Sequence, residues 1–551
     1  MMKLKRLAVF VLTVMLATGF LFNITGCGNS GISDDPKTLN IRIYKAGYGD
    51  AYIKAMAAKF EEIYYEEGYK VNVVESAETV LGAEVVNELM LGDKNRIDMY
   101  FSGGFSATDM INKAEEKGYD LVEDLSDIYE MHPITLTGEE ETEKTIEEKI
   151  DPMAKKYMQY VGSNEDYYGK YLFFPLYKSP TSLVINKKVL KDYEIDVPLT
   201  TNQLVAAVNK IAETSETTGV YPVSWAGLNA YTYWHCCEDL WMAQYEGEDR
   251  FLQTITMNGF ENPLDAVQVY DWEGYKHSLT VMDTMLDLDN TARGTINMGH
   301  GNAQHLFITG KAAFMANSGW LHNEMSANYS QYMDDIVMIK MPIISELGVK
   351  LGLDGKNGTD RAKCEEVLID IIAGIDAGKS DAEIVADAGT ANSVTVEPAD
   401  VAAVRDARYL MYDRGVTNQA IISNFSTKKD IAKLFLRMFA SDDSGQYLLT
   451  FANATSPFIL NTELDYSASS EFVKSAMALC DSEYTGLNRA FSGESLRQDA
   501  LVELFYGDSA PEKTIASGDG APGTTGAELW KKTGDEVKKI WEKTLRENNL
   551  I

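Results

Sequence analysis

The residue types that most often carry catalysis or metal binding are present, but their spacing forms no recognised motif. The chain contains no G-x-S-x-G, H-E-x-x-H or P-loop sequence. Cys236 and Cys237 are adjacent, and no C-x-x-C spacing offers a zinc site. No obvious ligand spacing relates the six histidines, which are His132, His235, His277, His300, His305 and His322. We therefore expect no catalytic residue, no bound metal and no cofactor.

Carboxylates are the most abundant candidates for chemistry, since the chain holds 83 Asp and Glu residues. A glycoside hydrolase needs two of them about 5–10 Å apart across a cleft. Asp50 with Glu78, or Glu238 with Asp239, could be arranged in that way, but so acidic a chain supplies such pairs by chance. Segments 287–298 and 354–365 begin like calcium loops but lack the glycine required at the sixth position.

Other candidates follow two β-like runs, residues 39–44 (LNIRIY) and 97–101 (IDMYF). In parallel sheets, ligands collect at the loops that follow the carboxyl ends of the strands. These loops are residues 46–50 and 102–105. They carry Tyr48, Asp50, Ser102, Gly103 and Phe105. For Asp50, capping of the following helix is at least as good an interpretation as ligand contact.

The elements that must position these loops alternate between strand and helix. Apolar residues recur at helical spacing from Ile53 to Ile63, and Val71–Val74 is the next β-like run. A second helix is predicted over 83–91, before the strand at 97–101. This alternation indicates an α/β lobe with a largely parallel sheet. A mature chain of about 520 residues exceeds a single core and predicts two or more lobes.

The amino terminus has the features of a secretory signal. A cationic run, Met1–Arg6, precedes an apolar stretch from Leu7 to Phe22 that is short for a membrane span. The sequence Ile24-Thr25-Gly26-Cys27 then resembles the bacterial lipobox, in which the cysteine is lipidated and becomes the first mature residue. We expect residues 1–26 to be removed, and residues 27–38 to form the lipidated Cys27 and a flexible tether.

Composition excludes several classes of function. Loss of Lys3, Lys5 and Arg6 with the signal changes the net charge from −33 to −36. Nucleic acid binding requires a basic face, so a nucleic acid partner is not expected. Four cysteines follow Cys27, namely Cys236, Cys237, Cys364 and Cys480, and buried free thiols are their simplest interpretation.

Several segments, taken in order, resemble the bacterial extracellular solute-binding proteins of sugar ABC importers, similar to the maltose-binding class. They are the lipobox, IRIYKAGYGDAY, IDMYFSGG, FFPLYKSPTSLVINKKVL, GKAAFMANSGW and STKKDIAKLFLRMFAS. The resemblance covers most of residues 39–545. It implies an α/β, two-lobed periplasmic-binding-protein-like fold of type II, with a hinge between the lobes.

The resemblance also implies domain boundaries. Residues 39–176 would form the first segment of lobe 1, and 177–341 the first segment of lobe 2. Residues 342–455 would return to lobe 1 with an insertion at 348–405, and 456–551 would span lobe 2 and the hinge-side helices. Chain crossings are expected near Pro175–Ser182, Met341-Pro342 and Thr455–Phe458.

By position in the family pattern, further ligand-binding candidates lie at the hinge and in lobe 2. They are Tyr177, Lys178, Ser179, Trp225, Asn229, Tyr231 and Trp320. A sugar needs directional partners for its hydroxyls and flat aromatic faces for its C–H surfaces. Trp320 is the leading candidate for stacking, with a core tryptophan as the alternative. Trp234 and Trp241 are expected in the core.

The resemblance implies a monomeric receptor for a carbohydrate, with permease subunits of an importer as its partners and the membrane reached through Cys27. Where maltose-type relatives carry an acidic hinge residue, this chain has Ser179, so maltose itself is in doubt. Two alternatives remain open, a binder of a peptide or polyamine and a surface glycoside hydrolase.

Overall fold

The computed structural model describes residues 31–43, 45, 47–75, 82–162, 164–229, 233–413, 415–481, 483–489, 496, 526–547 and 551. The signal segment, Cys27, Glu78 and Tyr231 therefore lie outside the described residues. Among the residues that are described, no helix is long and apolar enough to cross a membrane.

Lobe 1 is built on a five-stranded sheet in the order β2-β1-β3-β10-β4. The strands are β1 (Thr38–Ile43), β2 (Lys70–Glu75), β3 (Met99–Gly103), β4 (Phe174–Pro175) and β10 (Asn418–Ile422). β1 pairs in parallel with β2 and β3, whereas β10 is antiparallel to β3 and β4. Helices α2 (Ala51–Ile63) and α20 (Lys429–Met438) cover it, with Phe60 and Phe435 in edge contact at 5.3 Å.

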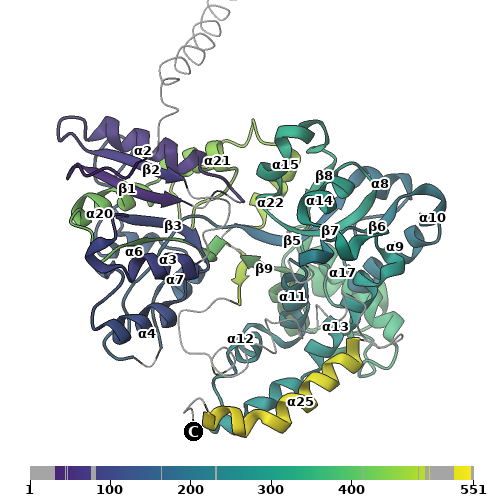
Figure 1. Ribbon diagram of the computed structural model, residues 1–551. Helices are drawn as coiled ribbons and strands as arrows, with labels where there is room; N and C mark the ends of the chain where they lie inside the picture. Colours follow the sequence, from purple (N-terminus) through teal and green to yellow (C-terminus); the bar gives the residue numbers. More distant parts are fainter. Residues whose placement is uncertain are drawn as a thin grey trace, which may run out of the picture.

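Lobe 2 is built on a second sheet in the order β11-β9-β5-β7-β6, with β8 also pairing with β5. The strands are β5 (Pro180–Asn186), β6 (Tyr221–Val223), β7 (Ala312–Ser318), β8 (Ile336–Met338), β9 (Leu410–Asp413) and β11 (Thr485–Leu487). β5 and β7 are buried along their whole length, as expected for central strands covered on both faces. Figure 1 shows lobe 1 on the left and lobe 2 on the right.

The remaining described helices connect and cover the two sheets. In lobe 1 they are α3 (Gly82–Leu89), η1 (Gly92–Lys94), α4 (Ala107–Lys117), α5 (Ser126–Tyr129), α6 (Ile146–Lys149), α7 (Pro152–Met158) and α21 (Ser444–Ala452). In lobe 2 they are α8 (Lys187–Asp192), α9 (Thr201–Ala212), α10 (Ser215–Thr218), η2 (Gly227–Asn229), α11 (Trp234–Glu246), α12 (Glu248–Thr256), η3 (Pro263–Asp271), α13 (Glu273–Leu286), η4 (Leu288–Asn290), η5 (Thr295–Asn297), α14 (His300–Ile308), α15 (Leu321–Tyr329), η6 (Ser330–Tyr332) and α22 (Glu471–Ala478).

Within the residues that the structure describes, the chain crosses between the lobes at three places. The first crossing joins β4 to β5, and the second joins β9 to β10 through η7 (Gly415–Thr417). The third follows Phe458, which bridges to Ile150 in lobe 1, and leads to α22, which packs on β8 of lobe 2. The first two crossings lie so close together that a Cβ at Gly415 would be 2.2 Å from the carbonyl oxygen of Tyr177. Any residue other than glycine would clash there.

The structure differs from the predicted boundaries after residue 341. Residues 342–413 stay with lobe 2, because β9 pairs with β5 and because Pro342 O accepts a hydrogen bond from Trp241 Nε1 at 3.1 Å. Arg408 at the end of the insertion donates to Met341 O at 3.0 Å. The chain therefore does not cross at Met341-Pro342. It returns to lobe 1 only after Asp413, at a strand pair that local sequence did not reveal.

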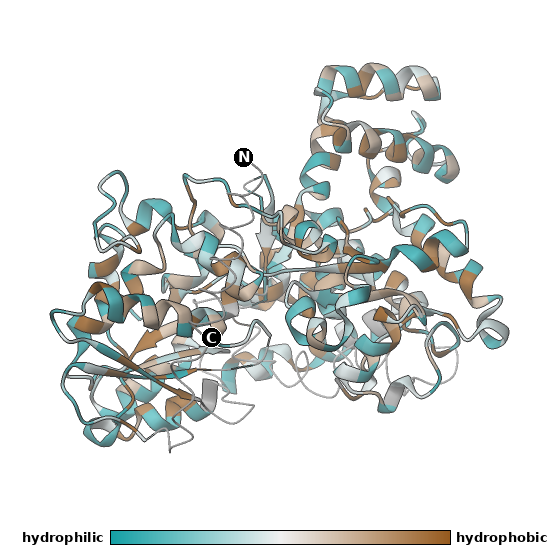
Figure 2. Cartoon of the chain, turned by 90° about the horizontal axis from the view of Figure 1, so that it is seen from above, coloured by the Kyte–Doolittle hydropathy of each residue, from teal (hydrophilic) through white to brown (hydrophobic). Residues whose placement is uncertain are grey.

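The insertion is a helical unit attached to lobe 2. It comprises α16 (Glu346–Lys350), α17 (Arg361–Asp376), α18 (Asp381–Asn392) and α19 (Pro398–Arg408). α16 and α19 contact α11 of lobe 2, and α18 packs on α17 and α19. Viewed from above, this unit stands out from the body of lobe 2 at the upper right (Figure 2).

Inside the insertion, the segment that begins like a calcium loop is held together by its own backbone. The Asp354 carboxylate accepts hydrogen bonds from the amides of Lys356 and Gly358, both at 2.8 Å, and of Asp360 at 2.7 Å. These bonds lower the pKa of Asp354 to about 2, against the opposing effect of burial. The carboxylate is thus engaged in a turn rather than free for a cation.

The carboxyl-terminal helix α25 (Gly526–Glu547) lies along the underside of lobe 2, drawn yellow in Figure 1. It packs on α13 and η3 through the buried side chains of Val537, Trp541 and Leu545.

Elsewhere in lobe 2, Trp234 and Trp241 are fully buried, as expected for core residues. Cys236, Cys237, Cys364 and Cys480 form no disulfide among the described residues, and all four are buried.

Candidate ligand-binding site at the junction of the lobes

The loop after β1 of lobe 1 reaches across to lobe 2 through Tyr48. Its hydroxyl donates to Ser179 Oγ at 2.9 Å, and only 3% of the residue is exposed. Its ring meets Tyr177 edge-on, with centroids 4.5 Å apart. A Cβ at Gly319 would lie 2.7 Å from the Tyr48 hydroxyl, so glycine is required there for Tyr48 to reach Ser179.

Below Tyr48, a chain of buried hydroxyls joins the first crossing to β7. Ser179 Oγ lies 2.9 Å from Ser318 Oγ, and Thr181 Oγ1 donates to the same Ser318 oxygen at 2.8 Å. All three residues are inaccessible to solvent. The three hydroxyls form hydrogen bonds with one another, so they hold the first crossing against β7. This arrangement also positions Ser179 to bind Tyr48.

Trp320 follows β7 and is surrounded by aromatic side chains from both lobes. Its Nε1 donates to the Tyr233 hydroxyl at 2.9 Å, and its ring lies 5.7 Å from Tyr48 in an edge contact. A Cβ at Gly47 would lie 3.5 Å from the indole, which is the distance of ordinary contact. Only 9% of Trp320 is exposed. With the lobes in this arrangement, one side of the indole is therefore covered by lobe 1.

Tyr233, which the sequence analysis did not select, holds an unusual backbone conformation beside Trp320. Its φ is 69°, in the left-handed region that bulky side chains rarely adopt. Its ring lies 6.1 Å from Trp320 and 5.9 Å from His300. Strained residues of this kind cluster at ligand sites. Its only sequence signal was its place two residues after Tyr231.

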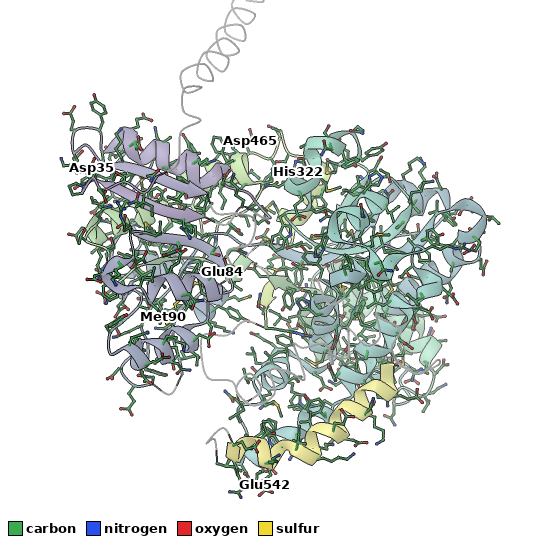
Figure 3. All side chains as sticks on the ribbon, viewed as in Figure 1. Asp35, Glu84, Met90, His322, Asp465 and Glu542 are labelled. Atoms are coloured by element: carbon green, nitrogen blue, oxygen red, sulfur yellow. The ribbon has the colours of Figure 1, made fainter. Side chains whose placement is uncertain are left out.

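We call Tyr48, Tyr177, Ser179, Tyr233, Ser318 and Trp320 the junction cluster. A hollow of about 430 Å³ opens beside it, lined by the loop after β1, by α15 and by the end of α21. Asn323 at its wall donates to Tyr48 O at 3.1 Å and to Ala452 O at 2.8 Å. In Figure 3, His322 and Asp465 lie at the upper edge of this junction.

Trp225 follows β6 and offers a hydrogen-bond donor without an acceptor. It is 2% exposed, and its Nε1 has no partner among the described residues. An unsatisfied buried donor costs about 1–3 kcal/mol, so Trp225 occupies a costly position in the interior of lobe 2. Asn229 lies in the short helix η2 shortly after Trp225.

Lys178 and Asp413 form a buried polar core behind the junction cluster. Lys178 Nζ lies 3.1 Å from Asp151 Oδ2 and 3.2 Å from Cys480 O. Asp413 Oδ1 accepts from the amides of Ser179 at 2.8 Å and Gly415 at 2.7 Å. Burial raises the pKa of the Asp413 carboxyl to about 6, against the opposing effects of the Lys178 charge and of the two amides.

The other predicted residues of lobe 1 lie apart from the junction cluster or are engaged elsewhere. Ser102 is buried in β3 opposite Gln419, and Gly103 ends that strand. Phe105 stacks on Phe173 with ring centroids 6.0 Å apart. Asp50 precedes α2 but makes no capping bond, and its carboxylate pairs instead with Lys54 at 2.9 Å and Lys45 at 3.4 Å.

Of the two carboxylate pairs considered for hydrolysis, only Glu238 with Asp239 lies within the described residues, and these two do not face each other across the junction. Glu238 and Asp239 are neighbours on α11, and both are buried. Arg489 binds Asp239 with two hydrogen bonds, of 2.8 and 2.9 Å. Within the described ranges, no group of three or more His, Cys, Asp or Glu residues is arranged to hold a metal ion.

Two α/β lobes joined by three crossings, with aromatic and hydroxyl groups where they meet, define a class of ligand receptor that closes about a hinge. The sequence matches the model of the family described as bacterial extracellular solute-binding protein over residues 45–446. The chain belongs to this family, whose members bind solutes outside the cytoplasm. No curated protein is similar enough in sequence to match the chain.

Solved structures of such receptors share the fold. The bacterial solute receptor AcbH, described with an exclusive preference for β-D-galactopyranose, has 14% sequence identity and a TM-score of 0.56, covering 92% of this chain and 99% of its own. The GacH receptor of Streptomyces glaucescens, solved unliganded and with acarbose, has 15% identity and a TM-score of 0.56, covering 92% and 98%. Maltose-bound MalE3 of T. maritima has 14% identity and a TM-score of 0.54, covering 91% and 99%. This likeness shows the two-lobed periplasmic-binding-protein-like fold.

Proposed function

We propose that this protein captures a carbohydrate, most simply an oligosaccharide, between its two lobes and delivers it to the permease subunits of an ABC importer. The observation that carries the proposal is the junction cluster, in which aromatic rings and hydroxyl groups from both lobes meet at the hinge. The similar solved structures include receptors described with galactopyranose, acarbose and maltose, which supports the same ligand class.

The chemistry of the junction suits a sugar better than a charged solute. Tyr48, Tyr177, Tyr233 and Trp320 supply aromatic surface with few rotatable bonds, against which the C–H faces of a sugar can pack. Lys178 pairs with Asp151, and Asp413 accepts the backbone amide of Ser179. Both charged side chains are therefore engaged by the protein itself. A polyamine or a peptide would need charged groups that face the ligand.

For ligand to reach the covered side of Trp320, the lobes must separate and close again. Gly47 and Tyr48 cover the indole from lobe 1, so opening at the crossings would expose it. We infer that the described arrangement is close to the closed one. Ligand would then shift the population from open to closed.

We further propose that Cys27 carries the lipid that holds the protein on the outer face of the cell membrane, and that the protein acts as a monomer. The lipobox-like sequence before Cys27 supports the anchor. Stable retention needs two or more acyl chains, because a single chain of myristoyl length gives only reversible binding.

Calorimetric titration of the mature chain with a panel of oligosaccharides tests the sugar proposal. Binding should occur, and chromatography of the incubated sugar should show it intact, since a binder releases no shorter products. Binding of polyamines or peptides, with none of any sugar in the panel, would contradict the proposed ligand class. Release of shorter sugars would instead favour the hydrolase.

A matched pair of tryptophan variants locates the site. Trp320→Ala should weaken sugar binding by roughly thirty-fold or more, the effect of truncating an aromatic hot spot. Trp272, which is half-buried and packs on Arg250 in lobe 2 away from the junction, serves as the control. Trp272→Ala should leave the affinity unchanged. If both variants bind the sugar as tightly as the wild type, Trp320 is not part of the proposed site.

A further inference from the structure

Asn323, on helix α15 of lobe 2, binds lobe 1 through both polar atoms of its side chain. Its Nδ2 donates to Tyr48 O at 3.1 Å and to Ala452 O at 2.8 Å, and its Oδ1 accepts from Asn453 Nδ2 at 2.9 Å. Tyr48 lies in the loop after β1, whereas Ala452 and Asn453 lie at the end of α21. One amide group therefore joins lobe 2 to two separate segments of lobe 1. We call Asn323, Asn453 and the two carbonyl groups the asparagine clasp.

The hydrogen-bonding capacity of Asn323 is used by the clasp itself. A side-chain amide nitrogen carries two donor hydrogens, and here each of them is directed at a backbone carbonyl. Because a carbonyl can only accept, the orientation of the amide is fixed, and its oxygen faces the Asn453 donor. No donor of Asn323 remains for a solute. Its contacts thus serve the joining of the lobes and not the recognition of a ligand.

The lobe 1 half of the clasp is held in place by backbone conformation. Asn453 ends α21 with a φ of 50°, and its backbone amide donates to Leu449 O at 3.0 Å. Asparagine is one of the few residues that adopt this left-handed conformation at a helix end. Ala452, whose carbonyl accepts from Asn323, is only 2% exposed. The acceptors and the donor that meet Asn323 are therefore fixed before the lobes come together.

The order of strands places the clasp on the side of the hinge where the lobes face each other. The first two crossings leave lobe 1 from β4 and β10 and enter lobe 2 at β5 and β9. In lobe 1, β1 is separated from β10 by β3, and in lobe 2, β7 lies on the side of β5 away from β9. The loop after β1 and helix α15 after β7 therefore meet beyond the crossings, beside Trp320. Hydrogen bonds weaken steeply beyond their normal length, so separating Tyr48 from Trp320 would also break the clasp.

We propose that the asparagine clasp is a latch that holds the two lobes closed and sets the ratio of closed to open molecules before any solute binds. Its bonds join only groups of the chain itself, so they form without a ligand. A solute that is retained by the closed form then has an apparent affinity proportional to the closed fraction. Asn323 is thus a positioning residue that raises affinity without touching the solute. The latch rests on the closure that belongs to the proposed function, and not on the class of ligand.

The separation of the lobes in the absence of sugar tests the latch directly. Double electron–electron resonance measures it between spin labels at Glu84→Cys on α3 and Ala206→Cys on α9, two exposed positions, in the full mature chain with Cys27→Ser. The four other native cysteines are buried and should take up no label. Asn323→Ala should lower the ratio of closed to open molecules about tenfold, the equivalent of one or two net hydrogen bonds. Asn328→Ala, at an exposed asparagine on the same helix, is the control and should leave the distances unchanged. Identical distances in wild type and Asn323→Ala would overturn the proposal.

The partner residue supplies an independent variant. Glycine adopts a left-handed φ without strain, so Asn453→Gly removes the donor to Asn323 Oδ1 and keeps the end of α21. It should lower the closed-to-open ratio by a smaller factor than Asn323→Ala. The double variant should resemble Asn323→Ala alone, because both substitutions remove the same bond. Two effects that multiply in the double variant would show that the side chains act separately, which contradicts a clasp.

Titration with D-galactose, maltotriose and raffinose separates failure of the latch from failure of the proposed function. For each of these sugars that the wild type binds, Asn323→Ala should raise the Kd by a common factor, because the substitution changes only the closed fraction. A loss confined to one sugar would make Asn323 a ligand contact and overturn the latch. If the distances shift as expected but no sugar binds, the latch stands and the proposed class of ligand is wrong.

Discussion

The buried carboxyl of Asp413 gives the hinge a pH dependence that a single substitution can isolate. Burial raises its pKa from 3.8 to about 6, so between these values the folded state holds a proton that the unfolded state has lost. Its contribution to stability is therefore fully present below pH 3.8 and is lost as the pH rises through about 6. The shift of about two units corresponds to about 3 kcal/mol.

Asp413→Asn removes this titration while keeping the hydrogen bonds. Oδ1 alone accepts both amides, of Ser179 and Gly415, and the asparagine carbonyl can do the same. The loss of charge also removes an attraction to Lys178, which retains Asp151. Relative to the wild type, the variant should therefore gain about 3 kcal/mol between pH 4 and pH 7. For about 520 residues that unfold together, this is an increase of about 3 °C in relative Tm.

Differential scanning calorimetry of wild type and Asp413→Asn across this pH range measures the difference between their Tm values. The titration of all other carboxyls is common to both proteins and cancels in this difference. Asp289→Asn, at an exposed carboxylate of lobe 2, is the control and should show no such trend. A difference in Tm between Asp413→Asn and wild type that is flat with pH, or that falls as the pH rises, would refute the reasoning. The charge of Lys178 would then outweigh the desolvation of Asp413.

Three further predictions concern a buried lysine, the lipid anchor and the closure of the lobes. Lys149 is 1% exposed and pairs with Glu141 and Asp442, so Lys149→Met should cost about 1–3 kcal/mol of unfolding free energy by leaving two partly buried carboxylates uncompensated. Lys155→Met, at a more exposed pair, should cost under about 1 kcal/mol in the same urea titrations. Cys27→Ser should release the protein from the membrane or leave it uncut, and an unmodified mature amino terminus in mass spectrometry would count against the anchor. A sugar that binds should reduce the radius of gyration in small-angle scattering, and an unchanged radius at saturation would speak against closure.

The early strands and their loops followed from local pattern, and the first crossing followed from the family resemblance. Alternating strands and helices over residues 39–101 predicted a largely parallel sheet, because parallel strands need a helical connection between them. In the structure, β1 pairs in parallel with β2 and β3. The segments FFPLYKSPTSLVINKKVL and GKAAFMANSGW, which carry part of the family resemblance, contain β4, β5 and β7. These elements are determined by hydrophobic periodicity, which a sequence displays directly.

The second crossing could not be predicted in the same way. β9 and β10 are short strands whose partners, β5 and β3, lie more than 200 residues earlier in the chain. Which sheet a short strand joins depends on the surface left open by the rest of the fold. The 342–413 segment therefore lies in lobe 2, although its own residues carry no signal for either lobe.

At the candidate site, the sequence determined which residue types would be present, and the tertiary structure decided how they are used. Tyr48, Ser179 and Trp320 were selected from loops and family pattern, and they lie together at the junction. Asp50 was selected on the same grounds but pairs with Lys54 and Lys45. Tyr233 and Asp413 acquire their roles only through strained backbone or burial. Strand and helix periodicity is encoded locally, whereas the desolvation and pairing of a side chain depend on residues that only the complete fold brings within contact distance.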